Sequence, residues 1–162
     1  MAAGKTAVAE ALARQLDCSM LDLDQFIAAS AGRSIQTIID EDGEARFRQM
    51  EESALRKALV SGTARVIALG GGTWISPRNR ALIAEHHGFT VWLDAPYELC
   101  WQRIVRTGDT RPLARDYVQA GRLYKERRPL YELAALRVQI NEETNAGVVA
   151  TEIVNALRQH KE

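Results

Sequence analysis

The sequence has few of the features that tie a protein to a special environment. Only two of its 162 residues are cysteines, and their spacing fits neither a disulfide framework nor a zinc site. Basic and acidic residues both number 21, and the zero net charge argues against nucleic-acid or anionic-membrane partners. No run approaches the ~18 apolar residues of a membrane span, and the first residues lack the basic flank and apolar run of a signal peptide. We therefore expect a cytoplasmic protein that binds no nucleic acid and no membrane.

The composition that remains is that of an ordinary globular protein, with 46% hydrophobic and 26% charged residues. The length fits one domain over 1–162. Apolar periodicity, caps and β-branched runs predict helices and strands in alternation. The expected helices are 6–16, 35–40, 44–60, 77–85, 96–105, 117–129 and 146–157, and the expected strands are 18–21, 65–69, 89–93 and 138–140. This order predicts an α/β fold with a parallel sheet covered by helices on both faces.

The chain begins with the second half of a phosphate-binding loop of the pattern G-x-x-x-x-G-K-[ST]. In Ala3-Gly4-Lys5-Thr6, the glycine lets backbone N–H groups face an anion, and the lysine can reach the β/γ-phosphates of a nucleotide. The threonine hydroxyl can bind Mg²⁺, and the N-terminus of the helix behind it adds partial positive charge. A bare G-K-T is a weak signal, because small residues precede Lys-Thr at many helix starts.

Two carboxylates, Asp22 and Asp24, follow a short apolar strand. On an extended backbone they point to opposite sides, so that one can face a metal and the other a neighbouring pocket. The alternative is that Asp24 only caps the helix that follows it. These residues alone leave both interpretations open.

Arg48 and Glu51 stand three residues apart on the helix expected at 44–60, so the glutamate can hold the guanidinium in one orientation. Taken alone, the pair is more simply interpreted as a solvated surface pair worth a few tenths of a kcal/mol. Three glycines, Gly70-Gly71-Gly72, come directly after an expected strand. Their cost in backbone entropy favours a close approach of the backbone to a ligand at the carboxyl end of that strand.

The segment 106–117 is polar and carries Arg106, Arg111 and Arg115 together with Gly108 and Pro112. Such a cationic loop suits a lid that closes over phosphates. An ordinary solvated connection is the alternative.

Several motifs occur in one order along the whole chain. They are Gly4-Lys5-Thr6, Leu21-Asp22-Leu23-Asp24, Gly32-Arg33-Ser34-Ile35, Gly43-Glu44 with Phe47-Arg48 and Glu51, Leu69-Gly70-Gly71-Gly72, Arg111-Pro112-Leu113 and Arg127-Arg128-Pro129-Leu130-Tyr131. No single motif is decisive, but the ordered set is specific. It resembles the shikimate kinase family, small P-loop kinases related to nucleoside monophosphate kinases.

The resemblance implies a three-layer α/β/α P-loop kinase fold. It implies transfer of the γ-phosphoryl group of ATP to the 3-hydroxyl of shikimate, a step in the biosynthesis of chorismate and the aromatic amino acids. ATP and shikimate would be the small-molecule partners, Mg²⁺ the cofactor, and the protein a monomer.

The resemblance also implies a role for each residue that matches a family motif. The ATP-binding residues would be Ala3, Gly4, Lys5, Thr6, Ala7, Arg106 and Arg111, and the metal-binding residues Thr6 and Asp22. The shikimate-binding residues would be Asp24, Arg48, Glu51, Gly70, Gly71, Gly72 and Arg127, with Glu51 steadying Arg48. The catalytic residues would be Lys5, Asp24 and Arg111. Of these, Asp24 would accept a hydrogen bond from the attacking hydroxyl and Arg111 would reach the transferring phosphoryl group.

The chain departs from the family pattern in two places. It contains neither the family's first strand nor the first glycine of the loop, so we expect a start codon assigned too late or a shortened chain. Each phosphate-facing N–H lost should cost about 1–3 kcal/mol of binding. In addition, Arg106 and Arg111 are closer together than in many members, which bears on lid closure more than on the choice of substrate.

Two other hypotheses stay open on the sequence. One is a kinase of the same fold that acts on another small carboxylated polyol such as gluconate. The other is a catalytically inactive nucleotide-fold protein that serves as a regulatory module. The absent half-loop favours the second, whereas the retained Asp22, Asp24, Arg48, Arg111 and Arg127 argue against it.

Overall fold

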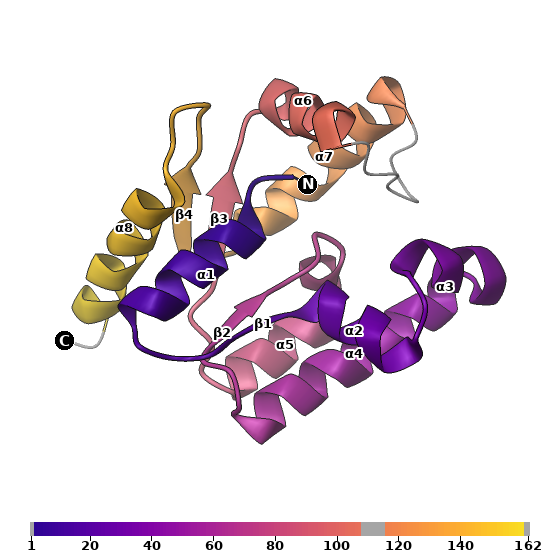
Figure 1. The fold of residues 1–162 in the computed structure, drawn as a ribbon, viewed down its shortest axis with the longest axis horizontal. Helices are drawn as coiled ribbons and strands as arrows, with labels where there is room; N and C mark the ends of the chain where they lie inside the picture. The colour runs from indigo at the N-terminus through magenta and orange to yellow at the C-terminus, as the bar shows by residue number, and fades with distance from the viewer. Residues whose placement is uncertain (1, 108–115, 161–162) are drawn as a thin grey trace. The chain divides into compact units, whose positions relative to one another are not determined.

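A computed structural model describes residues 2–107 and 116–160. Contacts divide the chain into two compact units (Figure 1). The terminal unit consists of Met1–Asp17 and Phe89–Glu162, and the middle unit of Cys18–Gly88. In the described part of the chain, no helix is long and apolar enough to cross a membrane.

The terminal unit joins the start of the chain to its second half. Its elements are α1 (Lys5–Gln15), β3 (Val91–Asp94), α6 (Tyr97–Thr107), α7 (Tyr117–Tyr131), β4 (Leu136–Gln139) and α8 (Ala146–Gln159). Strands β3 and β4 pair in parallel, with Val91 opposite Leu136.

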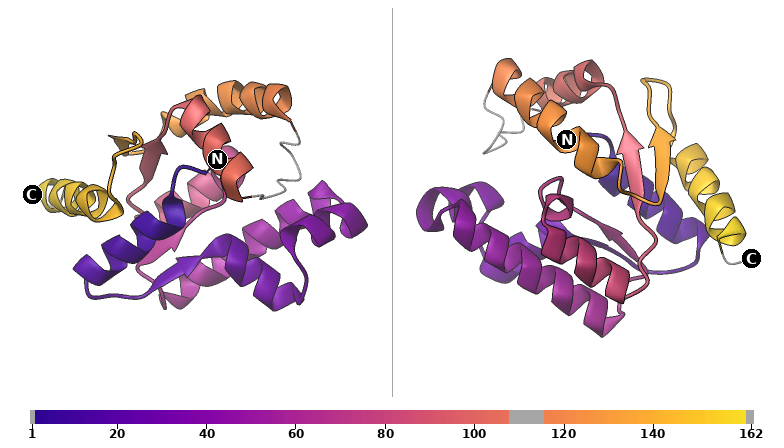
Figure 2. Two further views of the ribbon diagram at one scale, coloured as in Figure 1. Left: turned by 45° about the horizontal axis from the view of Figure 1, so that its top comes forward. Right: turned by 180° about the vertical axis from the view of Figure 1, so that it is seen from behind.

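Helices α1 and α8 pack side by side in all the views (Figures 1 and 2). Small buried side chains such as Ala9 on α1 and Ala150 on α8 permit this close packing. At one end of the pair, the Gln15 side-chain amide donates to the Gly147 carbonyl at 3.0 Å and to the Thr151 hydroxyl at 3.1 Å. These bonds fix the N-terminal helix to the C-terminal one.

An ion-pair cluster at the end of β3 connects it to α7 and β4. The buried Asp94 carboxylate accepts hydrogen bonds from Arg128 Nη1 at 2.8 Å and Nη2 at 3.1 Å, and from Arg137 Nε at 2.8 Å. Both guanidinium groups also lie about 5 Å from the Trp92 ring centroid, at 5.1 and 5.0 Å. One carboxylate therefore holds a helix and a strand in place.

The middle unit contains the remaining elements. They are β1 (Met20–Asp22), α2 (Leu23–Ala31), α3 (Ile35–Asp42), α4 (Glu44–Ser61), β2 (Val66–Ala68), the 3₁₀ turn η1 (Thr73–Ile75) and α5 (Pro77–Glu85). Strands β1 and β2 pair in parallel, with Met20 opposite Val66. The core of this unit contains Leu23, Ile27, Ile38, Phe47, Ala54, Leu55, Leu82 and Ile83.

Most predicted elements are confirmed to within a few residues. Ser34 caps α3 by accepting from the Thr37 N–H at 3.0 Å, and Ser76 caps α5 with Pro77 in the first turn. Along the described residues, however, the parallel strands form two separate pairs rather than one sheet.

Two boundaries differ from the sequence prediction. Helix α7 was expected to end at Pro129 but continues to Tyr131, because a proline so near the end of a helix removes only one of its last hydrogen bonds. Of the segment 106–117 that was expected to be a loop, residues 106 and 107 belong to α6 and Tyr117 begins α7. Arg111 and Arg115 lie outside the described residues.

The Asp94 cluster gives a testable prediction for stability. We expect Asp94→Ala to lower the free energy of unfolding by about 2–3 kcal/mol, because two guanidinium groups then lose their common carboxylate. Urea unfolding measures this loss. The matched control is Glu132→Ala, because Glu132 is exposed and its Oε1 lies as far as 4.0 Å from Arg128 Nε. This variant should lower the free energy of unfolding by less than about 0.5 kcal/mol. Equal losses in the two variants would contradict the structural role of Asp94.

Candidate functional site

The pair Arg48–Glu51 is the best-defined charged contact among the predicted site residues. Arg48 Nη1 donates to Glu51 Oε2 at 2.8 Å, and Nη2 donates to Glu44 Oε1 at 3.1 Å. The Glu51 residue is 1% exposed, whereas 30% of the Arg48 side chain is exposed. The interpretation as a solvated surface pair is therefore wrong, because one partner is buried.

This environment keeps the guanidinium charged and oriented. Burial lowers the pKa of Arg48, but the charge of Glu51 and the hydrogen bonds to Glu51 and Glu44 outweigh burial and raise it above its ordinary value. A permanently charged, planar group with two Nη atoms can bind a carboxylate through two parallel hydrogen bonds.

The glycine segment lies directly against two of the predicted functional groups. A Cβ at Gly70 would lie 2.7 Å from Asp24 Oδ1, and a Cβ at Gly72 would lie 2.3 Å from Arg48 Nη1. Both distances are shorter than a normal contact, so a side chain at either position would have to displace its neighbour. The sequence predicts that this backbone approaches a ligand, and that stays a prediction. The contacts that the structure shows at Gly70 and Gly72 are with the Asp24 carboxylate and the Arg48 guanidinium.

The two aspartates after β1 have different local roles. Asp22 ends the strand and caps α2, since its Oδ1 accepts from the N–H groups of Asp24 at 3.1 Å and Gln25 at 3.2 Å. Asp24 lies in the first turn of the helix, so the alternative that Asp24 is the cap is wrong. The expected alternation along an extended backbone is also wrong here, because α2 already begins at the fully buried Leu23.

The half-loop at the start of the chain forms the N-terminus of α1. Gly4 occupies the cap position with φ 89° and ψ 23°, a left-handed conformation that favours glycine. A glycine also brings no capping side chain, and Lys5, Thr6 and Ala7 form the first helical turn after it. Ala3, by contrast, is buried. The N-terminus of α1 thus begins directly after Gly4, and the binding of phosphates there stays a prediction.

Sequence reasoning missed Arg103, which lies at this helix start. Its Nη1 donates to the Ala2 carbonyl at 3.3 Å, and a Cβ at Gly4 would lie 3.8 Å from the same atom. The only local signal is that Arg103 lies four residues after Leu99, on the inner side of α6, next to the buried Ile104. The predicted Arg106 is exposed in the last turn of α6, and Arg127 is half-buried on α7.

The structure thus brings together Asp24, Arg48, Glu51 and the glycine segment within the middle unit. Within the terminal unit it places Ala3, Gly4, Lys5, Thr6 and Ala7 at one helix start. Arg111, predicted to act on the phosphoryl group, is outside the described residues.

Comparison with known proteins decides the family. The sequence model described as "Shikimate kinase" matches residues 1–158, nearly the whole chain. The chain belongs to the shikimate kinase family. The shikimate kinase of Synechococcus sp. is 40% identical over 161 residues, covering 97% of this chain and 83% of that protein. The shikimate kinase of Ruegeria pomeroyi is 40% identical over 165 residues, covering 100% of this chain and 83% of that protein.

Solved structures of the family have the same fold. The shikimate kinase from Acinetobacter baumannii, solved in complex with shikimate, is 34% identical, with a TM-score of 0.90 over 99% of this chain and 90% of that one. The shikimate kinase of Aquifex aeolicus is 28% identical with a TM-score of 0.82. The predicted α/β P-loop kinase fold is confirmed by these similarities.

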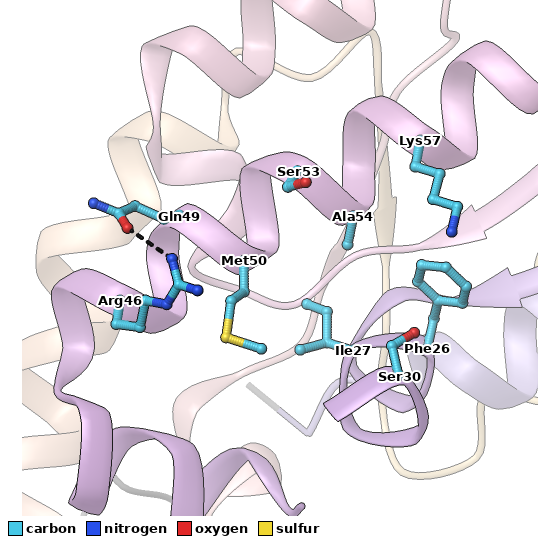
Figure 3. Close-up of a pocket in the computed structure, with 9 residues that line it drawn as sticks. All are labelled: Phe26, Ile27, Ser30, Arg46, Gln49, Met50, Ser53, Ala54 and Lys57. Carbon is cyan, nitrogen blue, oxygen red and sulfur yellow. Dashed lines mark hydrogen bonds between the residues drawn. The ribbon is translucent and has the colours of Figure 1, made fainter. Parts of the chain in front are cut away.

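In this member of the shikimate kinase family, a hollow of about 290 Å³ lies between α2 and α4 (Figure 3). Apolar side chains such as Phe26, Ile27 and Met50 line it, with Arg46 and Lys57 at its sides. None of the predicted site residues belongs to this lining, so the hollow is separate from the candidate site.

The cap at Asp22 gives a second testable prediction. Asp22→Ala should lower the free energy of unfolding by about 1 kcal/mol, because two N–H groups of α2 lose their side-chain acceptor. The matched variant Asp22→Asn keeps an acceptor of the same shape and should unfold within a few tenths of a kcal/mol of the parent. Chemical denaturation measures both. A loss in the asparagine variant as large as in the alanine variant would contradict the capping role.

Proposed function

We propose that the chain transfers the γ-phosphoryl group of ATP to the 3-hydroxyl of shikimate. The observation that carries this proposal is the Arg48 guanidinium, held by buried Glu51 against Gly72 while the Asp24 carboxylate lies against Gly70. A fixed cation and a carboxylate on one short glycine segment suit a substrate that has both an anionic and a hydroxyl group. The family membership and the shikimate complex of a 34% identical relative support the same substrate.

Each end of the substrate has its own partner in this proposal. Arg48 and Arg127 bind the shikimate carboxylate, and the bidentate geometry of arginine explains why an acid is chosen over a neutral sugar. Asp24 accepts a hydrogen bond from the 3-hydroxyl and orients it for attack, as a general base or an orienting group. Gly70, Gly71 and Gly72 give the substrate ring close access to the backbone.

The start of α1 binds the nucleotide in this proposal. The backbone of Ala3 to Ala7 faces the phosphates, and the Lys5 ammonium neutralises their charge. Arg106, in the last turn of α6, and Arg111 add cations in this proposal. Because little covalent chemistry falls to the protein in phosphoryl transfer, positioning and charge neutralisation supply most of the rate.

Mg²⁺ fits the oxygen donors available for it. Thr6 and Asp22 offer a hydroxyl and a carboxylate, which are the hard ligands that Mg²⁺ prefers. In residues 2–107 and 116–160, no three His, Cys, Asp or Glu side chains gather at one place. In phosphoryl-transfer enzymes, Mg²⁺ is commonly held by one or two protein carboxylates together with substrate phosphates. Bound there, the metal would neutralise phosphate charge. We further propose that the protein acts as a cytoplasmic monomer.

The direct test is ADP release from MgATP with and without shikimate. It is run on this chain and on a version extended upstream to a complete phosphate loop, with gluconate as a second acceptor. Shikimate-dependent release in either version supports the proposal. ADP release with gluconate but not with shikimate would show that the substrate is another carboxylated polyol. ATP binding without turnover in both versions would favour a regulatory module.

Removing the arginine proposed to bind the substrate carboxylate should weaken the use of shikimate but not that of ATP. Arg48→Ala should raise the KM for shikimate about 100-fold, because a charge-assisted bidentate contact is lost, while the KM for ATP stays within about twofold. The matched control is Arg46→Ala, on the same helix but exposed and bonded to Gln49. Steady-state kinetics with each substrate varied in turn measures both KM values. Equal loss of ATP and shikimate use would contradict the role of Arg48 in binding the shikimate carboxylate.

The two close glycines give a paired prediction. Neither Gly70 nor Gly72 has a positive φ, so alanine is tolerated by the backbone, and the added methyl must displace the neighbouring side chain. Gly72→Ala displaces Arg48 and should raise the KM for shikimate about tenfold. Gly70→Ala displaces Asp24 and should lower kcat about tenfold or more, as Asp24→Asn should. The same kinetic effect from both glycine variants would contradict the separate roles.

A further inference from the structure

Glu51 has hydrogen bonds at both carboxylate oxygens, and only one of them comes from Arg48. Oε2 accepts from Arg48 at 2.8 Å, and Oε1 accepts from the Thr73 hydroxyl at 2.7 Å. Glu51 is 1% exposed and Thr73 is fully buried. Both groups are shielded from bulk water, so among the described residues the Thr73 hydroxyl is the donor on which the second oxygen of Glu51 depends.

Thr73 also connects this carboxylate to the glycine segment. Its backbone N–H donates to the Gly70 carbonyl at 3.1 Å, which closes the turn that contains all three glycines. Its side chain reaches the opposite way, to Glu51 on α4. Thr73 thus connects the glycine segment, which lies beside Asp24, to Glu51, which orients Arg48.

Thr73 is itself held by α5. The buried Asn79 donates from Nδ2 to the Thr73 carbonyl at 2.9 Å. Arg80 Nη1 donates to the carbonyls of Trp74 and Ile75, each at 2.8 Å. These contacts fix the backbone of all three residues of η1, and with it the position from which the Thr73 side chain reaches Glu51.

The arrangement matters because an arginine side chain loses much conformational freedom when it binds a ligand. A guanidinium held in its bound orientation loses less, and the ligand binds more tightly for the same contacts. Glu51 can hold Arg48 only if the carboxylate itself has one orientation. The Thr73 hydroxyl supplies the second fixed point that sets that orientation.

We propose that Thr73 is a positioning residue for the substrate carboxylate, acting through Glu51 on Arg48. This inference rests on the proposed function of the same site. It adds a residue that does not touch the substrate and whose hydroxyl alone carries the effect.

The test compares Thr73→Val, which has nearly the same shape without the hydroxyl, with Thr73→Ser, which keeps it. Thr73→Val should raise the KM for shikimate about tenfold, with kcat and the KM for ATP within about twofold. Thr73→Ser should recover most of that loss. As a control, Thr37→Val removes a hydroxyl on α3 that lies 2.8 Å from the Ser34 hydroxyl, and it should leave all three constants unchanged.

The effect must also depend on Arg48. In an Arg48→Ala background, Thr73→Val should cause no further change in the KM for shikimate, because the group that it positions is gone. A general structural role predicts an additional loss there, and that result would overturn the inference. If Thr73→Val does not fold, Thr73→Ala against Thr73→Ser makes the same comparison, with thermal unfolding of each variant as the check.

Failure of this inference differs from failure of the proposed function. Shikimate-dependent turnover in the parent, with Thr73→Val kinetically unchanged, overturns only the role of Thr73. Absence of that turnover from the parent and from its upstream-extended version overturns the proposed function itself.

Discussion

The middle unit is organised around one buried negative charge, the carboxylate of Glu51. A charge that is 1% exposed is stable only if hydrogen bonds replace the water that it has lost. Arg48 and Thr73 supply them, and in doing so they connect α4 to η1 and to the glycine segment. The absence of a side chain at Gly72 follows from this constraint, because the guanidinium occupies the space that a Cβ would need.

The same constraint explains what the site can bind. Arg48 contacts two carboxylates, Glu51 and Glu44, yet 30% of its side chain stays exposed for a further partner. An anionic substrate would add a third negative charge around one guanidinium. The substrate carboxylate must therefore bind the guanidinium against the Coulomb repulsion of these two carboxylates.

Local signals allowed the sequence to predict much of the fold. The caps at Ser34 and Ser76 depend on neighbouring N–H groups, and the helix periodicities depend on spacing alone, so both could be predicted. The cap at Asp22 could not, because the end of β1 is set by pairing with β2, where Asp22 lies opposite Ala68. The ordered motifs identified the family, but the bond from Thr73 to Glu51 joins residues 22 positions apart and leaves no local pattern.

The central claim is that the oriented Arg48 selects the substrate by its carboxylate. The most direct measurement compares kcat/KM for shikimate and for its neutral methyl ester, in the parent protein and in Arg48→Ala. We expect the parent to have a kcat/KM about 100-fold higher for the acid than for the ester, and Arg48→Ala to lose most of this preference. A parent that uses acid and ester equally well, or an alanine variant that keeps the full preference, would contradict it.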